Sequence, residues 1–252
     1  MDEICTDDGI VAIIPARMSS SRLPGKPLLP LGSSTVLQQV ISRVTSADAG
    51  QKYLIATTQD DSDMPLREFC TAHEIPYFAG SMDDLLDRTT NAANHCEANY
   101  LVICSTAHPL LDPRMMDACA RYMLESDMDF VTVARMPSGV SVEALPLRTL
   151  TLTMEMTDSA YHREQITRFP LSSQNVFDCA FLPPPSRLAR EDLRLTLETP
   201  GDYAILQRIF SEVPARMHGL ISVEDIILYM DSVPELRNHG RYATHNSQSK
   251  AA

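Results

Sequence analysis

The sequence predicts an α/β protein of three layers, in which helices cover both faces of a mostly parallel sheet. Short apolar runs rich in β-branched residues, beginning with the run at 10–14, lack the alternation of a half-exposed strand. Such runs are typical of strands that are buried on both faces. Segments with apolar residues at helical spacing separate them. With 252 residues, 44% of them hydrophobic, the chain is long enough to form one large domain around a sizeable core.

The first third of the chain alternates between predicted strands and predicted helices. Ser33 or Ser34 is expected to cap a helix whose apolar residues recur at helical spacing over 36–44. Two further strands are expected at 53–58 and 76–79, with a helix between them. This order predicts repeated strand–helix–strand units, which build parallel sheets.

Acidic residues cluster where two of the predicted helices begin. The first cluster comprises Asp60, Asp61 and Asp63, and the second comprises Asp83 and Asp84, which follow a predicted cap at Ser81. Negative charge is favoured at a helix N-terminus, so capping explains both clusters. Paired aspartates also fit a metal ion, which we regard as the less economical interpretation of the second cluster.

The run at 100–104 is predicted to be a central strand, with the helix after it capped by Asp112 and started by Pro113. The methionine-rich face of that helix indicates core packing rather than a cofactor site. Ligands of open parallel sheets collect beyond the carboxyl ends of the strands. Residues 105–112 are therefore expected to face the segment that follows the first strand.

The spacing of apolar residues changes over 136–169, which predicts an arm within 136–180 that leaves the sheet. Residues 150–156 alternate like a strand, but Pro146 in a first helical turn favours a helix there. Further strands are expected at 174–180 and 193–197. Two helices should follow, one opened by Thr199 and Pro200 and one over 223–230. We expect residues 1–238 to form one domain, and the polar residues 239–252 to form a flexible tail.

Composition narrows the range of functions. The formal net charge of −12 argues against a nucleic-acid-binding protein, because phosphate backbones select basic surfaces. The six cysteines show no C-x-x-C spacing and predict free thiols rather than disulfides or a zinc site, which suits the cytoplasm. No apolar run approaches the roughly 20 residues of a membrane span, and no signal peptide precedes the domain, so we expect no membrane association.

Basic and small residues follow the first strand over 15–31 and make this stretch a local exception in an acidic chain. Arg17, Arg22 and Lys26 lie among serines and Gly25, and four prolines restrict the backbone. Small residues let backbone N–H groups approach phosphate oxygens, while the cations neutralise them. An ordinary strand-to-helix connection with solvated charges accounts for the same residues, and the residues alone leave both interpretations open.

The stretch PARMSSSRLPGKPL at 15–28 resembles the signature loop of the cytidylyltransferases that make CMP-activated sugars, such as the CMP-KDO synthetases, the acylneuraminate cytidylyltransferases and the spore-coat polysaccharide type. Residues 80–93 and 193–203 resemble the same family in the same order. The resemblance implies a Rossmann-like three-layer nucleotidyltransferase sandwich whose arm mediates a homodimer. It also implies the residues that surround CTP, with the first three also catalytic: Arg17, Arg22, Lys26, Pro15, Ala16, Ser20, Ser21, Thr57, Arg88 and Ser105.

By this resemblance, the reaction transfers CMP from CTP to a sugar or sugar-acid hydroxyl with release of pyrophosphate, in the synthesis of surface polysaccharide or glycan precursors. Glu143, Arg163 and Gln165 are implied to bind the acceptor substrate. Arg88 is implied to face the nucleotide or the sugar, and the alternative is a surface arginine paired with Asp84 or Asp87. Magnesium is the implied cofactor.

The sequence departs from the family pattern where the metal is expected. Ala107 stands in place of an aspartate after the central strand, and Glu198 stands in place of a second aspartate. Glu198 is therefore the remaining candidate for a metal ligand. On the acceptor side, Ser141 replaces an expected aspartate and Gln165 an expected histidine.

Three functional hypotheses stay open at this point. The first is an active cytidylyltransferase with a changed acceptor, whose Mg²⁺ is held by Glu198, the CTP phosphates, and His108 or Asp112. The second is a catalytically impaired, nucleotide-binding homologue that acts as a regulatory or structural partner. The third, a sugar-1-phosphate nucleotidylyltransferase that uses another nucleotide, is disfavoured because its glycine-rich first loop is absent.

Overall fold

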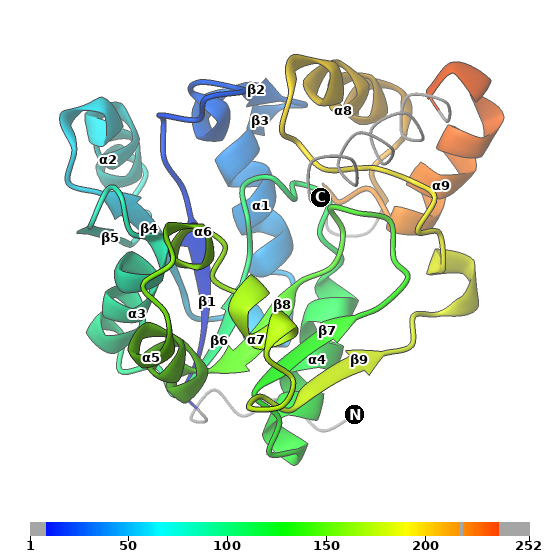
Figure 1. The fold of residues 1–252 in the computed structure, drawn as a ribbon. Helices are drawn as coiled ribbons and strands as arrows, with labels where there is room; N and C mark the ends of the chain where they lie inside the picture. Colours follow the sequence, from blue (N-terminus) through cyan, green and yellow to red (C-terminus); the bar gives the residue numbers. More distant parts are fainter. Residues whose placement is uncertain (1–8, 217–218, 237–252) are drawn as a thin grey trace.

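A seven-stranded sheet is the centre of the computed structural model, which describes residues 9–216 and 219–236 (Figure 1). Its strand order is β5-β4-β1-β6-β8-β7-β9, and β8 alone runs antiparallel to its neighbours. The strands are β1 (Ile10–Pro15), β4 (Tyr53–Thr58), β5 (Tyr77–Gly80), β6 (Tyr100–Ile103), β7 (Phe130–Val133), β8 (Glu143–Pro146) and β9 (Cys179–Leu182), with a separate two-stranded sheet of β2 (Pro30–Leu31) and β3 (Ser34–Thr35).

Helices lie on both faces of this sheet (Figure 1). They are α1 (Val36–Val44), α2 (Met64–Ala72), α3 (Leu85–His95), α4 (Pro113–Glu125), α5 (Leu147–Met156), α6 (Ala160–Glu164), α7 (Arg168–Ser172), α8 (Pro200–Glu212) and α9 (Val223–Ser232). Short 3₁₀ turns are η1 (Lys26–Leu28), η2 (Asp48–Gly50), η3 (Asp61–Asp63) and η4 (Ser186–Leu188). The predicted three-layer α/β fold is confirmed.

The strand β1 divides the core into two parts because its side chains alternate between the two faces. Ala12 and Ile14 pack on the face that α1, α4, α8 and α9 cover. Val11 and Ile13 pack on the other face, which α3 and α5 cover. Both faces of β1 are thus removed from water, as the unbroken apolar run predicts.

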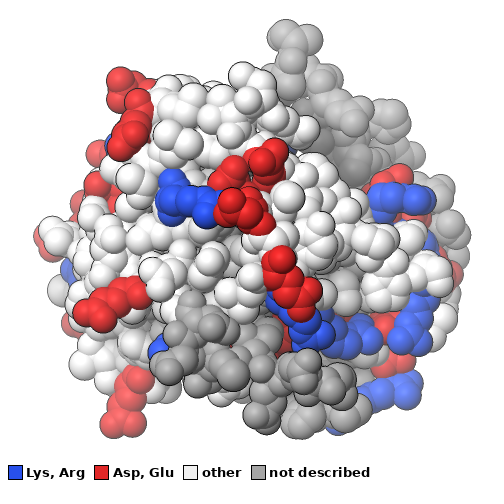
Figure 2. Space-filling model, turned by 90° about the horizontal axis from the view of Figure 1, so that it is seen from below, with Lys and Arg blue, Asp and Glu red and all other residues white. Residues whose placement is uncertain are grey.

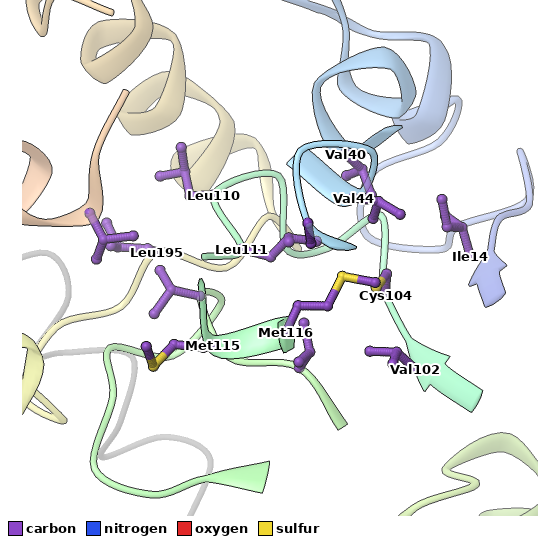
Figure 3. Close-up of a cluster of buried hydrophobic side chains, with 14 of the residues drawn as sticks. Ile14, Val40, Val44, Val102, Cys104, Leu110, Leu111, Met115, Met116 and Leu195 are labelled. Atoms are coloured by element: carbon purple, nitrogen blue, oxygen red, sulfur yellow. The ribbon is translucent and has the colours of Figure 1, made fainter. Parts of the chain in front are cut away.

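The first of these two cores contains the methionine-rich face of α4. Met116 reaches toward Cys104, which follows β6, near Val44 of α1, while Met115 lies on the side of Leu195 (Figure 3). All these side chains are buried. The prediction that this face packs in the core is therefore confirmed, and the five described cysteines are free thiols as predicted.

Two helix starts differ from the predictions. Thr35, and not Ser33 or Ser34, caps α1, because its hydroxyl accepts from the N–H of Gln38 while the Gln38 side chain accepts from the N–H of Thr35. This reciprocal capping box satisfies two backbone donors at once. Likewise α3 begins after Asp84 rather than after Ser81, since the Asp84 carboxylate accepts from the N–H of Asp87.

The predicted arm begins later than its sequence rhythm indicated. Residues 143–146 form β8, which lies inside the sheet between β6 and β7. A strand of four residues with a glutamate and a proline carries too little periodicity to be recognised. Residues 150–156 are helical as predicted, within α5. Of the strand predicted at 174–180, the structure has only the last two residues, which start β9.

The prediction of a strand at 193–197 is wrong, because this segment does not belong to the sheet. It makes one isolated bridge, in which Arg194 pairs with Ser138. Its apolar residues Leu193, Leu195 and Leu197 are buried, which explains the strand-like pattern. The predicted tail at 239–252 lies outside the described residues.

The face of the molecule that carries the amino ends of the parallel strands has a mixed charge. Figure 2 views this face from below and shows basic side chains beside acidic ones, with uncharged surface between them. None of the helices that the structure describes combines the length and the hydropathy needed to cross a lipid bilayer.

Candidate functional site

The basic loop after β1 is held in a defined shape by short backbone contacts. Gly25 has a left-handed conformation with φ of 71°, which a residue with a side chain rarely adopts, and its N–H donates to the carbonyl of Met18 at 2.9 Å. The backbone N–H of Met18 in turn donates to the buried carboxylate of Asp63. These contacts fix the backbone of the loop up to Lys26, so its cationic residues have defined positions.

This loop forms one wall of a polar pocket of about 250 Å³ at the carboxyl ends of β1 and β6. The open-sheet rule predicted a ligand site at this place. The lining residues are Pro15, Ala16, Arg17, Ser20, Ser21, Arg22, Lys26, Leu85, Arg88, Ser105, Thr106, Glu164 and Gln165. The pocket thus brings together nine of the ten residues predicted to surround the nucleotide, and one predicted to bind the acceptor.

Cations dominate the pocket wall, and each has a partner that phosphate oxygens would replace or join. Arg17 contacts Glu164 of α6 at 3.3 Å, and Arg22 contacts Glu198 at 2.8 Å. The ammonium of Lys26 donates to the carbonyl of Leu197 at 3.4 Å. Burial lowers the pKa of Lys26 to about 8, although the nearby Glu198 opposes that change.

Arg88 is buried, which excludes the surface position that we kept as its alternative. It lies on α3, is 2% exposed and donates to the backbone carbonyls of Ser81 and Met82. Its Nε has no hydrogen-bond partner among the described residues. Burial and then the charge of Arg17 lower the pKa of Arg88. A buried guanidinium with a spare donor at the pocket wall is suited to bind an oxygen-rich ligand.

Three of the residues predicted to bind the nucleotide or the acceptor lie outside the pocket wall. Thr57 is fully buried at the end of β4, and its hydroxyl has no hydrogen-bond partner among the described residues. Burial raises the pKa of Glu143, and a hydrogen bond from the hydroxyl of Thr167 opposes this change only in part. Arg163 contacts the carboxylate of Asp84 at 2.6 Å and so fastens α6 to α3. Their predicted roles in binding stay predictions.

Sequence reasoning missed two residues that shape the site. Asp63 was assigned to a helix terminus with Asp60 and Asp61, but it holds Met18 and the hydroxyl of Thr58 instead. Nothing in the sequence separates it from its two acidic neighbours. The second residue is Arg194, which contacts Glu198 at 3.0 Å and Asp202 at 3.3 Å. Its position between alternating apolar residues was the signal in the sequence that could have identified it.

The two positions expected to hold a metal do come together. The N–H of Leu197 donates to the carbonyl of Ala107 at 2.7 Å, so Glu198 lies beside the expected metal position. Of the two positions, 198 carries a carboxylate and 107 does not, and Oε2 of Glu198 already accepts from Arg22 and Arg194. Asp112 caps α4 and pairs with Arg114. In residues 9–216 and 219–236, no group of three or more histidines, cysteines, aspartates or glutamates is arranged to hold a metal ion.

His108 is a neutral side chain at ordinary pH. Burial and then the charge of Lys26 lower its pKa to about 4, although the charge of Glu198 and a hydrogen bond to the Ser141 backbone oppose this. His108 is thus a loop histidine held by a hydrogen bond to the backbone of Ser141. The residues around Glu198 therefore do not fit a magnesium ion held by the protein, since Mg²⁺ prefers hard oxygen ligands.

Comparisons with known proteins agree on one family. The model of the family described as cytidylyltransferase matches residues 11–191. An uncharacterized protein of Methanocaldococcus jannaschii is 29% identical over 232 residues, which cover 91% of this chain and 93% of that protein. The spore coat polysaccharide biosynthesis protein SpsF of Bacillus subtilis is 26% identical over 231 residues, which cover 90% of this chain and 95% of that protein.

Solved structures give the same result. A cytidylyltransferase from Leptospira borgpetersenii superposes with a TM-score of 0.81 at 25% identity and covers 90% of this chain and 96% of that one. A CMP:2-keto-3-deoxy-manno-octonic acid synthetase complexed with CTP superposes with a TM-score of 0.63 at 15% identity, covering 80% and 98%. The second likeness is one of fold.

Proposed function

The chain belongs to the cytidylyltransferase family, and from that membership we propose that it transfers CMP from CTP to the hydroxyl of a sugar or sugar acid. One observation carries the proposal. Arg17, Arg22, Lys26 and Arg88 line a single pocket at the carboxyl ends of the parallel strands, where the phosphates of a nucleotide would find both charge and backbone donors.

In the proposed reaction, the hydroxyl oxygen of the acceptor attacks the α-phosphorus of CTP. A new oxygen–phosphorus bond forms, the bond between the α-phosphorus and the bridging oxygen breaks, and pyrophosphate leaves while the hydroxyl loses its proton. Such a transfer depends mainly on positioning and on neutralising the phosphate charge. Arg17, Arg22 and Lys26 supply that charge from the protein.

The family typically uses Mg²⁺, which shields phosphate charge and orients the leaving group when it is bound. Because the residues around Glu198 do not fit a protein-held ion, we assign the steps above to side chains. An acceptor from polysaccharide or acid-sugar metabolism fits the similarity to the spore coat polysaccharide biosynthesis protein SpsF and to the CMP:2-keto-3-deoxy-manno-octonic acid synthetase. A homodimer and a cytoplasmic location stay predictions.

A second candidate function is a nucleotide-binding homologue with impaired catalysis. The observation that favours it is the asymmetry of the site, since the phosphate loop keeps its cations while position 107 is an alanine and Gln165 stands on the acceptor side. Both candidates bind CTP, and they differ in whether an acceptor is consumed.

Pyrophosphate release separates the two. The chain would be incubated with CTP and a panel of acid sugars and neutral sugars, both with Mg²⁺ and with a chelator, and pyrophosphate would be measured together with the CMP-sugar. Release with any acceptor supports the transferase. CTP binding without release under every condition supports the impaired homologue. If CTP does not bind more tightly than ATP and GTP, both are wrong.

A further inference from the structure

We propose that this chain binds its nucleotide without a divalent ion held by its own residues, and that arginine and lysine side chains take over the charge that such an ion would supply. The inference rests on the proposed function, because it concerns the same pocket. It departs from the family expectation for reasons that lie in the contacts of Ala107, Glu198 and Asp202.

The first reason is the junction between the segments at 105–108 and 193–198. The hydrogen bond from Leu197 to the carbonyl of Ala107, at 2.7 Å, holds these segments side by side. Gly139 allows this approach from the other side, since a Cβ there would lie 2.6 Å from backbone atoms of Leu195 and Thr196. A carboxylate at position 107 together with that of Glu198 would make a metal site, but Ala107 offers only a methyl group.

The second reason is that the remaining carboxylate is already neutralised. Arg22 and Arg194 donate to the same oxygen of Glu198, at 2.8 and 3.0 Å. Side chains thus stabilise this carboxylate as an anion with no metal involved.

The neighbouring acid is not free to act as a second ligand. One oxygen of Asp202 accepts from the N–H groups of Glu198 and Thr199, at 3.0 and 2.9 Å, and so completes the cap of α8. Arg194 contacts both oxygens at 3.3 Å. Moving this carboxylate to a metal would leave these half-buried donors without a partner, which opposes metal binding.

The balance of charge points the same way. Around the junction, Arg22, Lys26 and Arg194 face the two carboxylates of Glu198 and Asp202, so the place is cationic before a nucleotide arrives. A doubly charged cation is repelled from such a place, whereas a triphosphate is attracted. Mg²⁺ bound to the triphosphate lowers the negative charge that these side chains recognise, so it should not strengthen binding.

Calorimetric titration of CTP into the full chain, with a chelator and then with Mg²⁺, tests the inference. For the wild-type protein we expect the two dissociation constants to agree within about threefold, or CTP to bind more tightly in the chelator. For Ala107→Asp, which places a carboxylate beside Glu198, we expect Mg²⁺ to strengthen CTP binding about tenfold. Ala107→Asn is the matched control, since it has the same shape without the charge.

Several outcomes would overturn the inference. One is a wild-type affinity that Mg²⁺ strengthens about tenfold or more. Another is an equal response of the wild type and Ala107→Asp. A third is that Ala107→Asp folds and binds CTP equally well with and without Mg²⁺, and a fourth is that Mg²⁺ strengthens CTP binding to Ala107→Asn as much as to Ala107→Asp. Either of these two results would show that the missing carboxylate at position 107 does not explain the lack of a metal site.

A second readout separates this inference from the proposed function. If the folded wild-type chain binds no CTP in either buffer, the proposed function is wrong. Independently of CTP binding, Mn²⁺ is titrated into the nucleotide-free protein and followed by electron paramagnetic resonance, which tests the part of the inference that concerns the metal. Bound Mn²⁺ that disappears in Glu198→Gln would overturn the inference, whereas the absence of bound Mn²⁺ in the wild type would support it.

Discussion

The carboxylate of Asp63 accepts a hydrogen bond from the backbone N–H of Met18, which lies 45 residues earlier in the chain. The same carboxylate accepts from the hydroxyl of Thr58 at the end of β4, and it is fully buried. This contact ties the basic loop to the neighbouring strand. The arrangement of Arg17 and Arg22 therefore depends on a residue that does not line the pocket.

Asp63→Ala should destabilise the protein and weaken nucleotide binding. The half-buried N–H of Met18 and the buried hydroxyl of Thr58 would lose their partner, and we expect a loss of about 2–4 kcal/mol in the free energy of unfolding. Urea denaturation measures this. Asp61→Ala is the matched control in the same turn, because Asp61 is exposed, and it should change the free energy by less than about 0.5 kcal/mol.

Lys26→Met should weaken CTP binding by about tenfold or more while leaving the stability at pH 7 unchanged or higher. The reason is that burying the ammonium group destabilises the folded protein, which is why the pKa of Lys26 is lowered, while the same group binds the phosphates of the ligand. Calorimetry measures the affinity for CTP, and thermal unfolding measures the stability. Lys52→Met is the control, because Lys52 is an exposed lysine outside the pocket. Equal losses of affinity in both variants would contradict the role of Lys26.

The pH dependence of CTP binding should also report on Lys26, whose pKa is lowered from 10.5 to about 8 by burial. Phosphate needs the charged ammonium, so affinity should fall as the pH rises above 8, by at most about tenfold for each pH unit. In the free protein the sign for stability is opposite. The unfolded chain binds more protons between the two pKa values, so the contribution of Lys26 to stability rises with pH in that window. Lys26→Met should lack both effects.

Arg163→Met should loosen α6 from the body of the protein. Arg163 donates to the carboxylate of Asp84 at 2.6 Å, and the next residue, Glu164, contacts Arg17. We expect faster hydrogen exchange of the amides at 157–167 and a loss of about 1 kcal/mol or less in the free energy of unfolding, because the pair is only partly buried. Arg121→Met, at an exposed position on α4, should leave exchange at 157–167 unchanged.

Gly139→Ala should displace the segment that carries Glu198. Gly139 has φ of 95°, and a Cβ there would lie 2.6 Å from the backbone of Leu195 and Thr196. Gly219→Ala is a matched control, since Gly219 also has a positive φ, of 73°, but no atom within 4 Å of the added group. We expect the control to lose about 1–2 kcal/mol from backbone strain, and Gly139→Ala to lose clearly more in urea denaturation.

Local sequence signals determined much of this protein. The unbroken apolar run at 10–14 predicts a strand buried on both faces, and β1 is that strand. Asp112 followed by Pro113 predicts the start of α4, because cap and first turn are set by adjacent residues. The basic loop at 15–28 was recognisable for the same reason, since its cations, serines and Gly25 lie within one short stretch. Its three cations line the pocket together with Ser20 and Ser21.

The tertiary structure alone decided which distant residues meet. Arg22 and Glu198 are 176 residues apart and Met18 and Asp63 are 45 apart, so no periodicity relates them. The strand β8 needed its neighbours β6 and β7 to be a strand at all, because four residues carry too little pattern. Whether Glu198 faces a metal or two arginines is likewise a property of packing, since the charge around a carboxylate depends on which side chains the fold brings within reach of it.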